Sequence, residues 1–152
     1  MDGEEVATEG PKDTEEDPHQ YKTVIWLPDG IYIPSTNYLY KPGIRGRKFP
    51  YLYKEESVAK YQKLLIYLGE TTPLSRIQET VYFSLNLSLT FFIRDRFWLR
   101  DVSNMVKATE DAIVDIIGID DSRVLQLTAQ KILQKQKREG IGIRINGQLH
   151  AQ

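Results

Sequence analysis

The sequence contains no cysteine, which excludes disulfides, thiolate zinc sites and a cysteine nucleophile. Histidine is almost as scarce: the two residues, His19 and His150, stand near opposite ends of the chain, so a histidine-based triad or zinc site is not expected. No apolar run approaches the roughly 18 residues that span a bilayer, and the N-terminus lacks the basic and apolar pattern of a secretory signal. We therefore expect an intracellular, cytoplasmic protein with no membrane partner.

The net charge of −1 conceals an uneven distribution of charge along the chain. Residues 1–20 hold eight acidic residues against one base, Lys12, which leaves 19 basic and 13 acidic residues in 21–152. An acidic segment with few large apolar side chains is typical of disorder, so we predict a disordered acidic extension over 1–20 and one domain over 21–152. The basic domain favours a polyanionic partner. The acidic extension either competes with nonspecific nucleic-acid binding or only aids solubility.

Hydrophobic periodicity predicts a small domain of mixed α+β class, with a mixed β-sheet packed by two main helices. Apolar residues recur at three-and-four spacing over 55–68 and over 103–117, which predicts amphipathic helices. Alternation with period two over 78–92 predicts a half-buried strand, and Phe97 and Trp98 after it are expected in the core. Shorter β-branched or apolar runs predict further strands at 21–27, 124–133 and 140–145.

Residues 34–50, PSTNYLYKPGIRGRKFP, read as a long irregular loop. The loop carries four cations, Lys41, Arg45, Arg47 and Lys48, interleaved with aromatic residues. Loops longer than about 12 residues without secondary structure are usually functional or disordered. We predict a mobile basic arm that contacts DNA phosphates and stacks on unpaired bases. The alternative is a solvent-exposed connection whose aromatic side chains pack on the core.

The stretch 100–123, RDVSNMVKATEDAIVDIIGIDDSR, gathers the candidate chemistry. With Ser103 as the helix N-cap, Asn104, Lys107 and Asp111 share one stripe of the helix. If the loop after the helix folds back, Asp121 or Asp120 approaches Asp101, and two carboxylates then form a hard oxygen site for Mg²⁺ or Mn²⁺.

Such a metal could activate a water molecule, and Lys107 would stabilise negative charge developing on a phosphate. Arg94, Arg96 and Arg100 add positive charge for DNA beside this site. Spacing alone equally allows ordinary structural roles: a helix cap, a surface ion pair and solvated acids.

The order and spacing of these residues resemble the RusA family of Holliday-junction resolvases over 21–145. The family motif is an Asp, any residue, Asp-Asn, two residues and a Lys, and it is similar to Asp101-Val102-Ser103-Asn104-Met105-Val106-Lys107. A later Asp of the family is similar to Asp121. The resemblance implies a homodimeric, Mg²⁺- or Mn²⁺-dependent enzyme that makes paired nicks in four-way DNA junctions. It also implies that acidic residues hold the metal and that the motif Lys is needed for cleavage.

One departure from the motif is Ser103, which stands where the family has its second carboxylate. A hydroxyl binds a divalent cation more weakly than a carboxylate does. Either Asp111, Asp120 or Asp95 replaces the missing ligand, or the protein binds junctions without cutting them efficiently, or the sequence is an engineered inactive variant. Two functions are therefore carried forward: a junction endonuclease and a non-catalytic junction-binding protein. A small interaction domain with no nucleic-acid role is a third, remoter reading.

Overall fold

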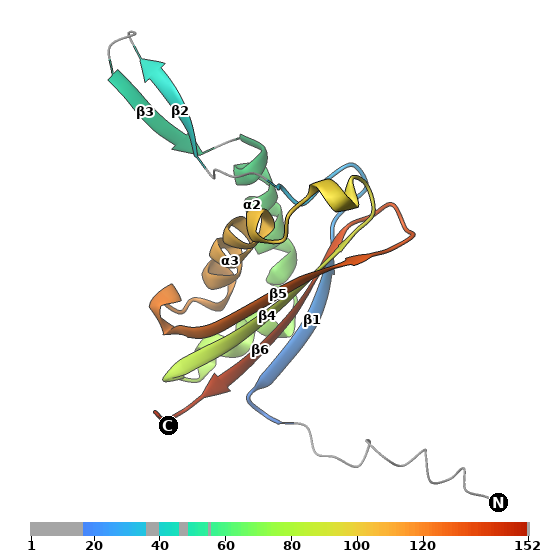
Figure 1. Ribbon diagram of the computed structural model, residues 1–152. Coiled ribbons are helices and arrows are strands. Elements are labelled where there is room, and N and C mark those ends of the chain that lie inside the picture. Colours follow the sequence, from blue (N-terminus) through green and yellow to red (C-terminus); the bar gives the residue numbers. More distant parts are fainter. Residues whose placement is uncertain (1–16, 36–39, 46–48, 55, 152) are drawn as a thin grey trace, which may run out of the picture.

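The computed structural model describes residues 17–35, 40–45, 49–54 and 56–151, and most of the predicted acidic extension lies outside them. Within these residues, two α-helices, three 3-10 helices and six strands follow one another along the chain (Figure 1). In chain order they are β1 (Gln20–Trp26), β2 (Tyr40–Arg45), β3 (Phe49–Lys54), α2 (Glu56–Gly69), η2 (Pro73–Glu79), β4 (Ser84–Ile93), η3 (Phe97–Leu99), α3 (Ser103–Ile117), η4 (Asp121–Arg123), β5 (Val124–Leu133) and β6 (Gly140–Gln148).

Four strands form one mixed sheet in the order β1-β6-β4-β5. β6 runs antiparallel to both of its neighbours, whereas β4 and β5 are parallel. A parallel pair needs a long crossover connection, and here the crossover contains α3. The predicted mixed sheet with two main helices, of α+β class, is confirmed.

The core lies between this sheet and the two helices. Every second side chain of β4 is buried on the helix side, from Leu85 to Ile93, and α3 buries the stripe from Met105 to Ile117. Gly118 ends α3 in the left-handed conformation (φ 68°), and its N–H donates to the carbonyl of Val114. Within the described ranges, no helix combines the length and the apolar character needed to cross a membrane.

The predicted strand over 78–92 begins too early. Pro73 and the Thr72 cap start the 3-10 helix η2, which occupies residues up to Glu79. The period-two pattern before β4 does not mark a buried face, because Val81 and Phe83 are 91% and 47% exposed whereas Tyr82 is buried.

Tyr82 packs against Tyr21 of β1. The hydroxyls of Tyr82 and Tyr21 lie 2.7 Å apart, and burial raises the pKa of Tyr82 to about 12.

The predicted irregular loop over 34–50 is wrong for residues 40–45 and 49–50, which form strands. β2 and β3 pair antiparallel, from Tyr40 opposite Lys54 to Arg45 opposite Phe49, as a separate two-stranded sheet. This hairpin projects from the body of the protein (Figure 1). Pro42 and Pro50 are tolerated because each strand of a two-stranded sheet is an edge strand, where a missing N–H need not break a ladder.

Candidate functional site

The segment between β4 and α3 is fixed by the buried side chain of Arg100. Its guanidinium pairs with both carboxylate oxygens of Glu139, at 2.5 and 2.7 Å, and the two side chains are 8% and 2% exposed. It also donates to the carbonyl oxygens of Ile33 (2.7 Å) and Asp95 (3.1 Å). The predicted DNA contact of Arg100 is therefore wrong for this structure, because its side chain is buried and both of its terminal nitrogens donate inside the protein.

A second cation, Lys131 of β5, holds the same segment from the other side. Its ammonium donates to the carbonyl oxygens of Phe97 (2.7 Å) and Arg100 (2.9 Å), and it lies 4.6 Å from the centre of the Phe97 ring. Trp98 is 81% exposed, so its predicted place in the core is wrong: β4 has ended at Ile93, and η3 turns this ring outward. The result is an anchored backbone immediately before Asp101.

Asp101 follows this anchored segment with its side chain exposed. Its carbonyl oxygen accepts from the N–H of Asn104 at 3.0 Å, at the start of α3. Ser103 is the first residue of α3 and is exposed, and the cap position falls on Val102, with no side-chain cap hydrogen bond. The N-cap role expected for Ser103 is therefore wrong, and its hydroxyl points to no partner among the described residues.

Lys107 lies on the next turn of α3 and pairs with Asp111. The ammonium and the carboxylate are 3.0 Å apart, with the two side chains 58% and 36% exposed. The pKa of Lys107 is raised, chiefly by the hydrogen bond that its ammonium donates to Asp111 and further by the charges of Asp111, Glu110 and Asp121, although desolvation opposes this shift. Lys107 is thus a protonated, accessible cation.

Further carboxylates gather along the C-terminal half of α3. Asp111, Asp115 and Asp121 line a cavity of about 380 Å³ between α3 and α2, together with Lys63. Desolvation raises the pKa of the neighbouring Glu110 carboxyl, with Asp111 and Asp121 adding to the rise and Lys107 opposing it. Sequence reasoning missed Glu110 and Lys63, because their relation to the cavity depends on how the two helices pack.

The two acids after α3 have different roles. Asp120 caps η4: its Oδ1 accepts from the N–H of Ser122 at 3.0 Å. The hydrogen bond from this N–H is the main reason that the pKa of Asp120 is lowered. Asp121 makes no such cap and lines the cavity instead. Asp120 thus serves the η4 cap, whereas Asp121 lies at the cavity beside Asp111 and Asp115.

A metal site would need these carboxylates to converge. Oxygen donors suit Mg²⁺ or Mn²⁺, but in the parts of the chain that the structure describes no group of three or more His, Asp or Glu side chains could hold a metal ion. From Asp101 to Asp111 the rise along α3 is about 15 Å, and Asp121 lies beside Asp111 and Asp115. Gly118 ends the helix and the chain continues directly into η4 and β5. The expected approach of Asp120 or Asp121 to Asp101 is thus not made within one chain.

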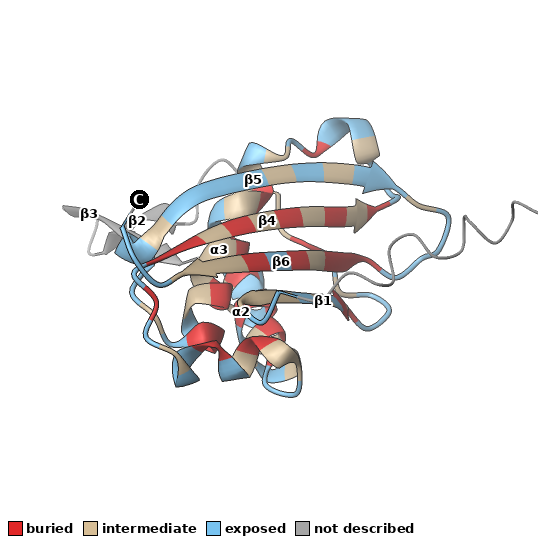
Figure 2. Ribbon diagram, turned by 90° about the horizontal axis from the view of Figure 1, so that it is seen from below, coloured by how far each residue is buried: buried red, intermediate tan, exposed pale blue. Residues whose placement is uncertain are grey.

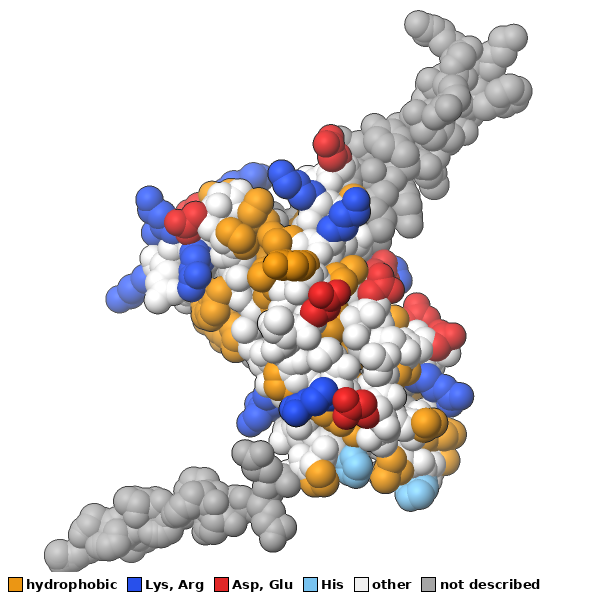
Figure 3. All heavy atoms as spheres, turned by 180° about the vertical axis from the view of Figure 1, so that it is seen from behind, with side chains coloured by type: hydrophobic (Ala, Val, Ile, Leu, Met, Phe, Trp, Pro, Cys, Tyr) orange, Lys and Arg blue, Asp and Glu red, His pale blue; other side chains and the backbone are white. Residues whose placement is uncertain are grey.

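The remaining predicted DNA-binding cations are distributed over two regions. Lys41 and Arg45 lie in β2, whereas Arg47 and Lys48 fall outside the described residues. Arg94 and Arg96 are exposed after β4, and Arg94 contacts Asp95 (3.3 Å) and the carbonyl of Lys135 (3.2 Å). Figure 3 shows Lys and Arg side chains gathered at one end of the body, with exposed hydrophobic side chains among them. Their contact with DNA stays a prediction.

Comparison with known proteins gives one family. The family model described as endodeoxyribonuclease RusA matches residues 41–146. The matched range runs from β2 into β6 and includes Asp101, Lys107 and Asp121. No curated protein matches the chain.

Proposed function

The chain belongs to the RusA endodeoxyribonuclease family, whose model covers residues 41–146, and from this premise we propose that it resolves four-way DNA junctions by paired symmetric nicks during recombination and repair. The family implies endonuclease activity on Holliday junctions. This proposal includes four finer claims. The enzyme depends on a metal ion, it is a homodimer, its site is active, and it works inside the cell.

The observation that carries the proposal is the arrangement around Lys107. This side chain is held protonated and is 58% exposed, inside the range that matches a nuclease family. A cation placed next to a scissile phosphate stabilises the charge that develops there during cleavage. We assign that role to Lys107, with Asn104 and Ser103 as auxiliary groups one turn before it.

We propose Mg²⁺ or Mn²⁺ as the cofactor, with Asp101 and Asp121 as ligands and Asp111 and Asp120 as auxiliary carboxylates. All four donors are oxygen atoms, which suits these ions. The bound ion would supply a nucleophilic water. Since Asp101 follows a segment anchored near the end of β5 and Asp121 lies just before the start of β5, a site that uses both needs a contribution from a second chain.

The edge strand β5 supports a homodimer as the source of that contribution. Its ten residues are mostly exposed, with Leu125 at 70% and Leu133 at 58% (Figure 2). Proteins normally protect a long edge strand with charge, proline or a bulge, because its free N–H and C=O groups pair readily with another strand. β5 contains a single charged residue, Lys131, whose ammonium is turned inward to the backbone.

Antiparallel pairing of two β5 strands about a twofold axis would also bring the separated carboxylates together. Asp121 lies just before the start of β5, whereas Lys131, near its end, anchors the segment before Asp101. In an antiparallel pair the start of one strand lies beside the end of the other. Asp121 is then moved toward Asp101 of the partner subunit. Two such sites related by a twofold axis match the symmetry of a four-way junction.

The second candidate function is a junction-binding protein that does not cut. Ser103 favours it, because the motif has one carboxylate fewer than the family pattern. Here the basic hairpin and the body would bind the junction while the site stayed inactive.

Cleavage of a synthetic mobile four-way junction separates these two functions. The protein is incubated with the junction or a matched linear duplex in Mg²⁺, Mn²⁺ or EDTA, and products are resolved on a denaturing gel. We expect paired, metal-dependent nicks in the junction alone. Tight junction binding without nicks, together with cutting by the Ser103→Asp variant, would establish the second function instead.

Mixing two inactive variants tests the shared site. Asp101→Asn and Asp121→Asn should each abolish cleavage, but a mixed dimer retains one site with both carboxylates if the ligands come from different subunits. We expect the mixture to recover nicking at one strand. If mixed dimers form but no nicking is recovered, each site takes Asp101 and Asp121 from the same chain. Leu125→Asp should give monomers that do not cut.

A further inference from the structure

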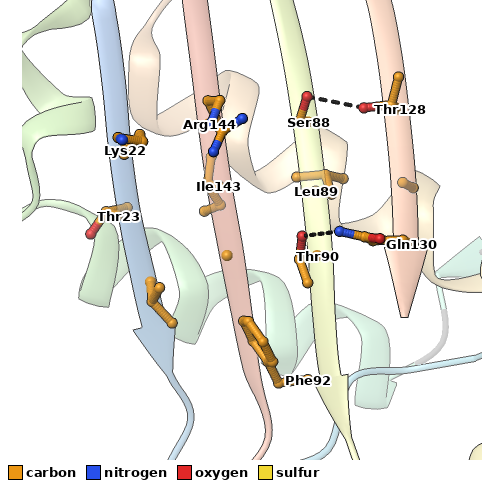
Figure 4. Close-up of a pocket in the computed structure, with 13 residues that line it drawn as sticks. Lys22, Thr23, Ser88, Leu89, Thr90, Phe92, Thr128, Gln130, Ile143 and Arg144 are labelled. Carbon is orange, nitrogen blue, oxygen red and sulfur yellow. Dashed lines mark hydrogen bonds between the residues drawn. The ribbon is translucent and has the colours of Figure 1, made fainter. Parts of the chain in front are cut away.

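One face of the four-stranded sheet is covered by no helix of the described residues. On this face a shallow hollow of about 570 Å³ extends across all four strands (Figure 4). The strand registers place alternate residues there in rows that run across the sheet. We refer to this surface, formed by the even-numbered residues of β1, β4, β5 and β6, as the open face.

One row of the open face sets two cations side by side. Lys22 of β1 is the direct partner of Arg144 of β6, and the row continues through Ser88 to Thr128. Both cations are exposed, and neither has an ion pair with any residue in the described part of the chain. Like charges directly opposite each other on neighbouring strands are destabilising. Repulsion between Lys22 and Arg144 therefore lowers the stability of the free protein, and a bound anion would remove this repulsion.

The same row, and the neighbouring row of Thr90 and Gln130, supply neutral hydrogen-bonding groups. Thr128 donates to the Ser88 hydroxyl (3.0 Å), and the amide of Gln130 donates to the Thr90 hydroxyl (3.2 Å), as Figure 4 shows. Ser88 and Thr90 each accept in these pairs, so each keeps its own O–H available for an acceptor outside the protein. Phosphate oxygens are acceptors of this kind.

The open face has no acidic side chain. None of the strands β1, β4, β5 and β6 contains an Asp or Glu residue. At the other end of the face, Trp26 lies over Gly140, where an added Cβ would come within 2.5 Å of its ring, and Arg138 lies 5.7 Å from the ring centre. The cationic character thus continues toward the basic turn between β5 and β6.

We propose that the open face binds the phosphate backbone of a duplex DNA arm, away from the residues that cut. This inference rests on the proposed function, which makes a DNA junction the ligand. It concerns a surface separate from Asp101, Lys107 and Asp121. The unopposed cation pair, the free hydroxyls and the absence of acids fit a polyanion. A second copy of the chain fits poorly, because two open faces would set cations against cations with no carboxylate between them.

Salt dependence of junction binding tests the proposal. The double variant Lys22→Gln with Arg144→Gln removes two phosphate contacts, so the slope of log affinity against log salt concentration should become shallower by about 1.8 for duplex arms. The nicking rate at saturating protein should not change, because neither residue lies at the cutting site. Wild-type protein should also bind a long-armed junction more tightly than a short-armed one, and the variant should lose that preference.

A matched control separates local contact from total charge. Lys60→Gln removes one exposed cation from α2, in the helix layer, and should alter the slope less than Arg144→Gln alone. Thr128→Glu should weaken binding by placing a carboxylate in the cation row.

Equal slopes for wild type and the double variant would overturn this proposal, while nicking by both proteins would leave the proposed function intact. A change of oligomeric state with unchanged DNA affinity would overturn it as well and make the open face an interface between copies. If wild-type protein binds no DNA, the proposed function itself fails and this inference fails with it.

Discussion

Arg100 immediately precedes the motif and Lys107 ends it, seven residues later, yet the fold uses the charges of these two residues in opposite ways. Arg100 is buried against Glu139, with four hydrogen bonds inside the protein. Lys107 is 58% exposed and has one carboxylate partner, Asp111. The sequence offers no sign of this difference, since both residues lie in a charged stretch.

The comparison indicates that the buried cation fixes the backbone before Asp101, whereas the exposed cation stays accessible to a ligand. A buried ion pair with satisfied hydrogen bonds holds a backbone segment in one place, and the segment it holds ends at Asp101. An exposed ion pair is worth little to stability, so under the proposed function Lys107 exchanges Asp111 for a phosphate at little energetic cost. Substitutions at the two cations should therefore separate folding from cleavage.

The largest effect is expected from Arg100→Met. It leaves the Glu139 carboxylate buried without its partner, which should lower the free energy of unfolding by about 3–5 kcal/mol. Urea denaturation followed by fluorescence measures this loss. The double variant Arg100→Met with Glu139→Met should recover part of the stability, because both charges are then gone. A single variant as stable as wild type would show that Arg100 does not anchor the segment.

A loss of cleavage without a loss of stability is expected from Lys107→Ala. The rate of junction nicking should fall about 10²–10³-fold, the usual effect of removing one group that stabilises developing charge. Junction affinity and the melting temperature should change little. Lys107→Arg should keep part of the activity because it keeps the charge. Equal losses of binding and cleavage would instead make Lys107 a DNA contact.

The smallest effect is expected from Glu110→Gln and depends on pH. Desolvation raises the folded-state pKa of Glu110, so the folded protein resists ionisation more than the unfolded chain does. Stability should therefore fall as pH rises from below the ordinary Glu pKa through the raised folded value. The Gln variant should be more stable than wild type at neutral pH, by less than about 0.5 kcal/mol, and equal to it at acidic pH. Denaturation at two pH values checks the sign.

Periodicity predicted those elements whose burial follows a simple pattern. α3 and β5 have the predicted bounds of 103–117 and 124–133, since an apolar stripe at three-and-four spacing and a β-rich run between turn signals are local features. The hairpin of β2 and β3 was not predicted, because its Pro and Gly residues read as a loop. Pairing between strands is set by partners that local composition does not identify.

For the candidate site, the sequence predicts residues, whose roles stay predictions, but it does not predict their geometry. Spacing and family resemblance select Asp101, Lys107 and Asp121, and all three lie in the range matched by the family. The separation of Asp101 from Asp121 depends on where Gly118 ends α3 and on the direct entry into η4. The burial of Arg100 depends on Glu139, 39 residues later, which a local pattern does not include.

The position of β6 also has a consequence for when the protein can fold. β6 is the last strand in chain order, yet it lies between β1 and β4 and pairs with both. During synthesis, at about 5–20 residues per second, β1 waits without a partner strand until residues 140–148 have left the ribosome. The sheet is therefore expected to close only after translation of this strand, and a chaperone that binds exposed strand edges would act on the chain in that interval.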